Sequence, residues 1–524
     1  MHIPPGQPKG SSNRGTNAQT RGLDTARDHL RGWLTADDPR LALGTAVGIA
    51  IAAGVGVGAL LGSLGPVLAL GAVGALAAGV LLLRSTEWGL LALLALICLL
   101  PYAALPVEIG FRPTFIDLAL LAVFGVWMLG LVTPAPSGNA RERTLLGSAL
   151  GLPILAFLLW TLITFVAGLA HSPVNATVLR RFSEVLLAVV LCLVVVNQVR
   201  ETERLRRITA AIIVAGGLSG CLGVVFYVLP GDWTVAILSK LAVFNYPAGA
   251  GILRYVEDDP AQPLRAIGTS IDPNALGGLM VVVAAVAVVQ LFAARPALPR
   301  RWLAPLAGAM ALCLLLTFSR GSMIGLAAGL ALAGILRYRK LLLVLAVLAV
   351  LMFVLPPTQV YVTRLIEGLQ GQDLATQMRF GEYKDALILI SRYPVLGVGF
   401  TGTPDIDIYV GVSNLYLLLA EQIGLVGLLL FLVIVSTHLV VTLGALRRAS
   451  VGDERAGYLL AYLSALAGAL VGGVFDHFFF NINFIHLVAL FWVVVGLGLA
   501  SAELINSAEA ARPAAAPDGH VLRS

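Results

Sequence analysis

An arginine at position 320 stands between two nearly pure hydrocarbon stretches, in the segment Leu-Thr-Phe-Ser-Arg-Gly of residues 316–321. Residues 302–318 and most of residues 322–336 are apolar. A guanidinium in such surroundings costs roughly 2.5–3.5 kcal/mol on membrane-insertion scales. Its best partner is an oxyanion, because its rigid fork of N–H donors matches carboxylate and phosphate groups. The alternative is a short outer turn from which Arg320 reaches phospholipid head groups.

Further arginines stand where other apolar stretches begin. Arg180 and Arg181 open one stretch, Arg265 lies just before another, and Arg379 begins a segment with helical periodicity. Guanidinium groups from distant segments at one depth suit a diphosphate at the membrane surface, held by charge-assisted hydrogen bonds. The alternative is a set of surface ion pairs with nearby acids such as Glu257, each worth under about 1 kcal/mol.

Candidates for acid–base chemistry are few. Asp476 and His477 are adjacent at the end of a late apolar stretch, where the carboxylate could orient the imidazole as a general base. The alternative for His477 is an interfacial or structural role. No residues have metal-ligand spacing, and no P-loop or dinucleotide fingerprint is present, so we expect neither a metal nor a cofactor. Gly397-Val-Gly399 is too short to argue a phosphate cradle and is interpreted as a glycine turn.

Composition indicates which elements carry these residues. Of the 524 residues, 58% are hydrophobic and only 12% are charged, whereas a soluble domain has about 25% charged residues. We therefore predict an all-α, polytopic membrane bundle of about 14 transmembrane helices, each needing about 20 apolar residues. The predicted spans are residues 41–62, 64–83, 87–105, 115–133, 146–170, 179–198, 207–229, 274–294, 302–318, 321–337, 340–356, 413–440, 456–475 and 483–501.

Basic loops set the expected orientation. Clustered arginine and lysine residues follow the fourth, sixth, eighth, tenth and twelfth predicted spans, and such loops face the cytoplasm. Both termini then lie in the cytoplasm, and the arginines described above lie at the outer face. Residues 1–40 and 508–524 read as disordered cytoplasmic tails around a transmembrane domain of residues 41–507.

Two long loops fall on the predicted outer side, residues 230–273 and 357–412. Loops of this length usually carry function or structure of their own. The second contains a candidate amphipathic helix at residues 378–392, which we expect to lie flat at the outer surface or to pack over the bundle. Its predicted face consists of Arg379, Tyr383, Ala386, Leu387 and Ile390.

Three segments stand in order around these loops. They are Arg265-Ala-Ile-Gly-Thr-Ser-Ile-Asp-Pro-Asn274, Thr317-Phe-Ser-Arg-Gly-Ser322, and Arg379-Phe-Gly-Glu-Tyr-Lys-Asp-Ala-Leu387 followed by Tyr393-Pro-Val-Leu-Gly-Val-Gly-Phe400. The last leads to Ser413-Asn-Leu-Tyr-Leu417 and Glu421-Gln-Ile-Gly-Leu-Val-Gly427. Over residues 260–440, the chain thereby resembles the O-antigen ligase and O-antigen polymerase superfamily.

The resemblance implies a metal-independent, membrane-embedded glycosyltransferase. Such enzymes take a glycan from an undecaprenyl diphosphate carrier at the outer side of the bacterial cytoplasmic (inner) membrane. Ligases pass it to lipid A core, and polymerases pass it to another carrier-linked repeat unit. The resemblance also implies that Arg265, Arg320 and Arg379 hold the diphosphate. Arg180 and Arg181 are further candidates because of their position at the start of an apolar stretch.

One departure from the family pattern concerns the catalytic base. Ligases commonly show His-Asn at the end of the second long loop, where this chain has Ser413-Asn414. A serine hydroxyl is a poor general base, because its pKa lies far above neutrality. The role then falls to His477 with Asp476, to Glu382 or another acid, or leaving-group stabilisation alone drives the reaction. The candidates for the acceptor side are Ser413, Asn414 and Tyr383.

Two functions from other classes are alternatives, a transporter and a structural membrane protein. A flippase or exporter of lipid-linked saccharides would use the same arginines, but it needs polar groups near mid-membrane and access from both sides. A structural membrane protein would not keep the costly Arg320. Because the polar residues gather on one side, we predict a surface polysaccharide polymerase or ligase-like transferase. Its partners are the carrier-linked glycan, a saccharide or lipid-linked saccharide acceptor and membrane lipids, with no nucleic acid, since the net charge of +6 is spread over many loops.

Overall fold

The computed structural model describes residues 85–510 apart from residues 109, 133–146, 172, 403–410 and 451, and all described residues belong to one compact unit. Regular structure in this part is helical, and its β pairing is limited to two isolated bridges. The predicted spans 41–62 and 64–83, the tail 1–40 and residues 511–524 lie outside the described part.

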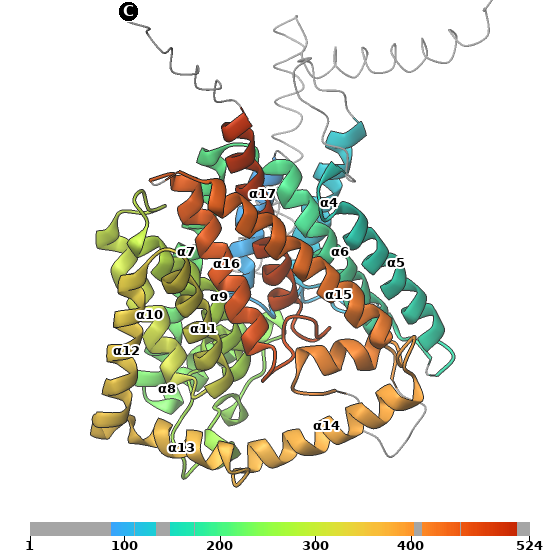
Figure 1. Ribbon diagram of the computed structural model, residues 1–524. Coiled ribbons are helices and arrows are strands. Elements are labelled where there is room, and N and C mark those ends of the chain that lie inside the picture. Colours follow the sequence, from blue (N-terminus) through green and yellow to red (C-terminus); the bar gives the residue numbers. More distant parts are fainter. Residues whose placement is uncertain are drawn as a thin grey trace, which may run out of the picture. The chain divides into compact units, whose positions relative to one another are not determined.

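The helices are shown in Figure 1. They are α3 (Thr86–Leu99), α4 (Phe115–Val132), α5 (Gly151–Gly168), α6 (Ala176–Gln198), α7 (Thr202–Val228), α8 (Gly231–Ser239), α9 (Pro273–Phe292), α10 (Arg300–Leu316), α11 (Arg320–Leu336), α12 (Arg339–Val354), α13 (Gln359–Leu369), α14 (Leu374–Arg392), α15 (Leu415–Arg448), α16 (Glu454–Gly472) and α17 (Ile485–Ala510). Short 3₁₀ turns occupy parts of the loop between α8 and α9 and precede α13.

The remaining twelve predicted spans each overlap one of these helices. Among the described helices, six are long and apolar enough to cross a membrane, namely α5, α7, α9, α15, α16 and α17, and the bent pair of α12 and α13 would make a seventh. The chain is therefore a multi-pass membrane protein with an all-helical fold. The total of about 14 spans remains a prediction.

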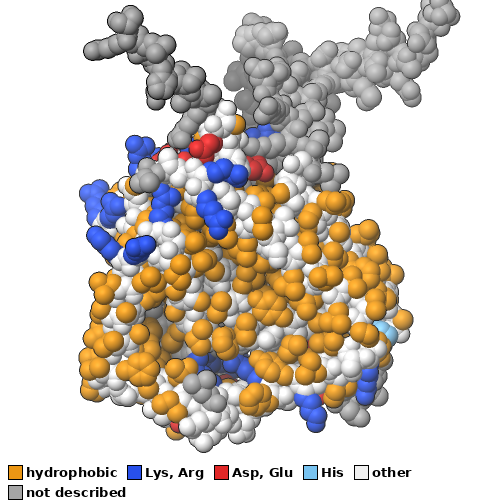
Figure 2. Space-filling model, in the orientation of Figure 1, with side chains coloured by type: hydrophobic (Ala, Val, Ile, Leu, Met, Phe, Trp, Pro, Cys, Tyr) orange, Lys and Arg blue, Asp and Glu red, His pale blue; other side chains and the backbone are white. Residues whose placement is uncertain are grey.

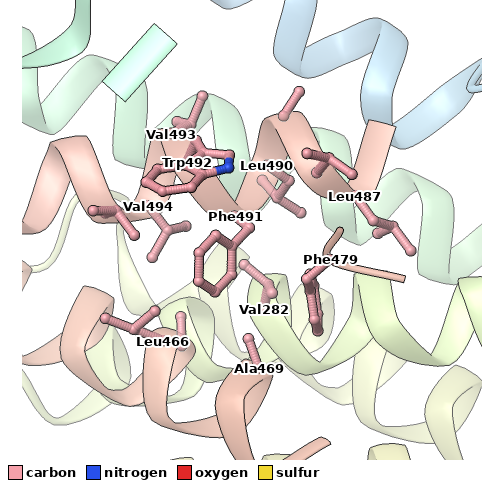
Figure 3. Packing of buried hydrophobic residues seen from close by; sticks show 14 of the residues in the cluster. Val282, Leu466, Ala469, Phe479, Leu487, Leu490, Phe491, Trp492, Val493 and Val494 are labelled. Carbon is pink, nitrogen blue, oxygen red and sulfur yellow. The ribbon is translucent and has the colours of Figure 1, made fainter. Parts of the chain in front are cut away.

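Helix α17 lies at the centre of the packing. Its most apolar 18-residue window is entirely buried, which is expected for a helix surrounded by other helices. Figure 3 shows Phe491 and Trp492 of α17 beside Leu466 and Ala469 of α16 and Val282 of α9. Hydrophobicity all around this helix thus reflects its place inside the bundle rather than contact with lipid.

Small residues bring α11 and α16 unusually close together. A Cβ atom at Gly325 would lie 2.7 Å from the Gly468 carbonyl oxygen, and one at Gly329 would lie 2.3 Å from the Ser464 carbonyl oxygen. Such glycine spacing lets helix backbones approach closely. At the end of this contact, Gly321 packs against the side chain of Phe475. The start of α11, with Arg320, is therefore fixed beside the loop that follows α16.

Helix α15 is broken near its start, whereas the sequence predicted one continuous span at residues 413–440. Gly424 adopts φ 71°, which glycine tolerates best. The backbone N–H of Val398 donates to the Glu421 carbonyl at 2.8 Å, and that of Gly399 donates to the Gln422 carbonyl at 2.9 Å. A neighbouring loop thus satisfies the carbonyls that the break releases. Gly397 and Gly399, for which the sequence predicted a glycine turn, have φ 67° and 75°, values that glycine tolerates best.

Two helices cover one end of the bundle, called here the α14 end. Helices α12 and α13 meet at 92°, and α13 and α14 then run across the base of the view in Figure 1. The predicted helix 378–392 is thus part of a longer α14. Of its predicted face, Ala386 is buried and Leu387 is 56% exposed, and Leu389 supplies a further buried contact.

Loops predicted to be cytoplasmic meet at the opposite end of the bundle. A guanidinium N–H of Arg337, after α11, donates to the carbonyl of Ser450, after α15, at 3.1 Å. Figure 2 shows basic side chains at that end, above a broad apolar band. The α14 end is accordingly the end predicted to face outward.

Candidate functional site

Arg265 is anchored in the loop before α9 but keeps its charge without a direct counter-ion. Its Nε donates to the Thr317 carbonyl at 2.8 Å, and a terminal N–H donates to the side-chain oxygen of Asn274. Burial lowers the pKa of Arg265 to about 10, although the nearby Asp272 carboxylate opposes that shift. Arg265 is therefore a cation at neutral pH whose hydrogen-bond acceptors are neutral.

Backbone strain marks the segments on either side of this anchor. Ile271 has φ 60° and Phe318 has φ 54°, values that are unusual for bulky or β-branched residues. Ile271 directly precedes Asp272, the N-cap of α9, and Phe318 directly precedes Ser319, the N-cap of α11. Such conformations cost about 1–3 kcal/mol each and concentrate at functional sites. Neither strained residue was singled out by the sequence.

Arg320 links the start of α11 to α13 and α14, the helices of the α14 end. Its guanidinium donates to the Arg364 carbonyl of α13 and forms an ion pair with Asp373, the N-cap of α14. The ring of Phe318 stacks on Tyr361 of α13, with centroids 4.8 Å apart. Burial raises the pKa of Asp373, but hydrogen bonds from Thr376 and Arg320 outweigh it and leave the pKa below its ordinary value. The acid that partners Arg320 is thus ionised.

Helix α14 is tied to the start of α15 by two consecutive residues. The Glu382 carboxylate accepts a hydrogen bond from the Ser413 backbone N–H at 2.8 Å. The Tyr383 hydroxyl donates to the Ser413 carbonyl at 3.3 Å. Asn414 caps α15 through its side-chain oxygen, and its amide N–H group donates to the Val474 carbonyl at 2.9 Å. Ser413 and Asn414 therefore join α14, α15 and the loop after α16.

The Asp476–His477 pair lies in that loop. The His477 backbone N–H donates to the Asp476 carboxylate at 2.8 Å, and its Nδ1 lies 3.5 Å from the same oxygen. Burial raises the pKa of Asp476 to about 7, with Arg379 opposing part of the shift. Burial also lowers the pKa of His477. At neutral pH the pair holds a carboxyl group near its titration point beside a neutral imidazole.

Arg379 completes this group of residues. Among the described residues it makes no hydrogen bond and no ion pair, yet its charge acts on Asp476, His477 and Tyr383. We call the following set the Arg379 cluster. It consists of Arg265, Asp272, Arg379, Glu382, Asp476 and His477. The charges of Asp272, Arg379 and Glu382 act on the pKa values of Asp476 and His477, and those of Asp272 and Asp476 act on the pKa of Arg265. Figure 2 shows basic side chains set back in a hollow between the apolar band and the α14 end.

Arg180 and Arg181 lie in a separate cavity at the start of α6. Arg180 bonds Asp117 of α4 at 2.8 Å and also Glu184 one turn along α6. Arg181 donates to the side-chain oxygen of Asn483. The cavity has a volume of about 340 Å³. The charges of Arg379 and Glu382 thus act on Asp476 and His477, and that of Asp476 acts on Arg265, whereas Arg180 and Arg181 line a second site.

Two residues of these sites were not predicted from the sequence to be functional. Asp272 lines the cavity of Arg180 and also belongs to the Arg379 cluster, so it connects the two. Asp373 was not considered, although it is the ion-pair partner of Arg320. Asp272 lies inside the segment 265–274, and its position in that segment could have marked it as a functional candidate. In the described part of the chain, no three His, Cys, Asp or Glu side chains are arranged to hold a metal ion.

Comparison with known proteins agrees with part of the sequence argument. A sequence model of the O-antigen ligase family matches residues 305–432. This match supports the resemblance to the O-antigen ligase and polymerase superfamily. No curated protein sequence matches the chain. The matched segment contains Arg320, Asp373, Arg379 and Glu382, whereas Arg265 and the Asp476–His477 pair lie outside it.

Proposed function

We propose that this chain, part of which matches the O-antigen ligase family, transfers a glycan from undecaprenyl diphosphate to a saccharide acceptor. The reaction would take place at the outer face of a bacterial cytoplasmic membrane. The main support is the Arg379 cluster, in which Arg265 and Arg379 form no ion pair among the described residues and the carboxyl group of Asp476 titrates near neutrality. A surface polysaccharide polymerase and an O-antigen ligase-like enzyme both fit this arrangement.

Arg265 and Arg379 are the groups best prepared to receive a diphosphate. Arg265 donates only to neutral oxygens, and Arg379 has no bonded partner among the described residues. Fixed donors aimed at developing negative charge stabilise a transition state without reorganising. As the glycan leaves its carrier, negative charge grows on the diphosphate oxygen, and these two guanidinium groups would neutralise it.

Arg320 would contribute after an exchange of partners. In this structure its guanidinium is bonded to Asp373 and to the Arg364 carbonyl. A phosphate oxygen must therefore replace one of these bonds before Arg320 can help to hold the carrier. Until then, Arg320 acts by keeping α13 and α14 docked on the start of α11.

Asp476 is the favoured general base. An acceptor hydroxyl would attack the anomeric carbon, its proton would pass to the Asp476 carboxylate, and the bond between that carbon and the diphosphate oxygen would break. A base works best when its pKa lies near the working pH, and the Asp476 pKa of about 7 meets this condition. His477 and Glu382 are the other candidates. Each carboxylate accepts one backbone N–H, Glu382 from Ser413 and Asp476 from His477.

The proposed function is tested by reconstituting the purified protein in vesicles with labelled carrier-linked glycan and candidate acceptors. We expect glycan transfer without any energy source, and loss of at least about 10²-fold in rate for Arg265→Ala and Arg379→Ala. Lys384→Ala is the matched control, because Lys384 is an exposed cation on the same helix as Arg379. Movement of the carrier across the bilayer without transfer would instead support the rival flippase.

A further inference from the structure

The cavity beside Arg180 lies between elements from four parts of the chain. It is bounded by residues 101–114, the start of α6, the loops before α9 and the residues just before and at the start of α17. Its volume of about 340 Å³ exceeds the roughly 30 Å³ that one water molecule occupies in the liquid. The space is therefore large enough for a ligand of several heavy atoms.

Buried polar atoms without partners gather on the wall of this cavity. The Ser270 hydroxyl, both ring nitrogens of His486 and Nε of Arg180 have no hydrogen-bond partner among the described residues. Ser270 and His486 are each 0% exposed. Leaving such a group unsatisfied costs about 1–3 kcal/mol, and buried polar groups are normally bonded. Two buried side chains without partners, together with one unpaired guanidinium nitrogen, line one cavity and point to a polar ligand with several donors and acceptors.

Charge on the cavity wall is balanced rather than basic. Arg180 is bonded to two carboxylates, that of Glu184 in the lining and that of Asp117 outside it, and Asp272 is the second acid of the lining. Arg181 and Arg254 are the other lining cations, so three lining arginines are opposed by two lining carboxylates and by Asp117, which pairs with Arg180. A diphosphate would meet repulsion from those acids. A hydroxylated, uncharged ligand would find donors and acceptors held in fixed positions by the ion pairs.

Two aromatic residues in the lining and the position of the cavity add to the case for a sugar. Tyr102 meets the ring of His486 edge-on, with centroids 5.2 Å apart, and both residues line the cavity. Asp272 belongs to both the cavity and the Arg379 cluster. A ligand in the cavity would therefore lie next to the proposed reaction centre.

We propose that this cavity is a saccharide subsite, which holds an uncharged sugar ring beside the point of transfer. The proposal rests on the function proposed above and extends it, because it assigns Arg180 and Arg181 to the sugar rather than to the diphosphate. The ring belongs either to the donor glycan or to the acceptor, which present the same hydroxyl chemistry.

The first test varies the concentration of each glycan separately in the reconstituted assay. We expect Ser270→Ala and His486→Phe to raise KM about tenfold for one of the two glycans, with kcat changed less than twofold. The glycan affected identifies the source of the ring. Ser219→Ala is the matched control, because Ser219 is also buried with an unpartnered hydroxyl but lies in α7 and does not line the cavity.

A second test does not depend on transfer. The purified protein is heated with the soluble repeat-unit oligosaccharide of the host's surface polysaccharide, or with pyrophosphate, and the shift in Tm is measured. We expect the oligosaccharide to raise Tm for the parent protein and for Ser219→Ala, and much less for Ser270→Ala. If the oligosaccharide raises the Tm of Ser270→Ala and His486→Phe as much as that of the parent protein, the subsite is overturned. It is also overturned if these variants lose only the Tm shift caused by pyrophosphate and keep the shift caused by the oligosaccharide. Absence of transfer with this oligosaccharide pattern intact would overturn only the proposed function.

Discussion

The Glu382 carboxylate on α14 accepts a hydrogen bond from the backbone N–H of Ser413, 31 residues further along the chain, at 2.8 Å. The next residue, Tyr383, donates to the carbonyl of the same serine at 3.3 Å. Helix α14 thus forms hydrogen bonds with both the backbone N–H and the backbone carbonyl of Ser413, and neither bond involves the Ser413 side chain. The position where ligases commonly carry a histidine is therefore held in place by contacts that any residue there could make.

This relationship predicts that Glu382 positions α15 rather than accepting a proton. Glu382→Gln keeps a carbonyl oxygen for the Ser413 N–H, so it should retain most transfer activity. Glu382→Ala removes that acceptor, which costs about 1.5–3 kcal/mol for a hydrogen bond to a charged group, and should lose most activity together with Tm. Equal, severe losses in both variants, measured as kcat with Tm recorded in parallel, would instead make Glu382 the base.

The pH dependence of activity should follow Asp476. Because burial raises its pKa to about 7, the carboxylate that serves as base is formed only as pH rises through that value. We expect the transfer rate to climb between about pH 6 and pH 8 in proportion to ionised Asp476. Asp476→Asn should lose this rise along with most activity, and an unchanged pH profile in that variant would reassign the base.

The same group should make the folded protein less stable at higher pH. The folded-state pKa of Asp476 lies above the unfolded value near 3.8, so the folded state binds the proton more tightly. The contribution to stability is complete below pH 4 and is lost as pH rises to about 7. Tm measured across this window should fall less in Asp476→Asn than in the parent protein, with Lys384→Ala as an exposed control. Parallel curves for all three proteins would contradict the assignment.

Substitution of Asp373, the ion-pair partner of Arg320, can separate two roles of Arg320: binding a phosphate oxygen and holding α13 and α14 against α11. Asp373→Asn weakens the competing ion pair, whose acid side chain is only 2% exposed, so we expect a lower KM for the carrier-linked glycan and a lower Tm. Arg320→Ala leaves Asp373 as an uncompensated buried charge, and breaking such pairs costs about 3–5 kcal/mol. We expect it to lose polymer formation, and full activity would remove Arg320 from the diphosphate site. Membrane protein levels measured in parallel report any loss of folding.

Close contact between α11 and α16 should be sensitive to a single methyl group. Gly329→Ala would place Cβ 2.3 Å from the Ser464 carbonyl oxygen, and overpacking of this kind costs about 1–3 kcal/mol. Gly308→Ala, in α10, is the matched control, because a Cβ atom there meets nothing within 4 Å. Thermal unfolding in detergent should show a lower Tm only for Gly329→Ala, and equal Tm values would mean that the helices can separate without loss.

The sequence alone determined the helices and one end of the site. Apolar stretches such as 274–294 and 321–337 match α9 and α11 closely, because backbone groups in lipid must be satisfied within the segment itself. Alternation of the predicted spans also put Arg265, Arg320 and Arg379 at one end of the bundle. These properties depend on local composition and on the number of apolar segments between two residues, and both can be obtained from the sequence directly.

Tertiary structure alone decided which side chains face each other. The bond from Arg320 to Asp373 joins residues 53 positions apart. At the break near Gly424, the carbonyls of residues 421 and 422 accept hydrogen bonds from the backbone N–H groups of residues 398 and 399. The unpartnered groups of Ser270 and His486 meet across one cavity although 216 positions separate them in the sequence. Such pairings depend on how closely helices such as α11 and α16 approach and on how loops fold over them. No local pattern of residue types encodes those distances.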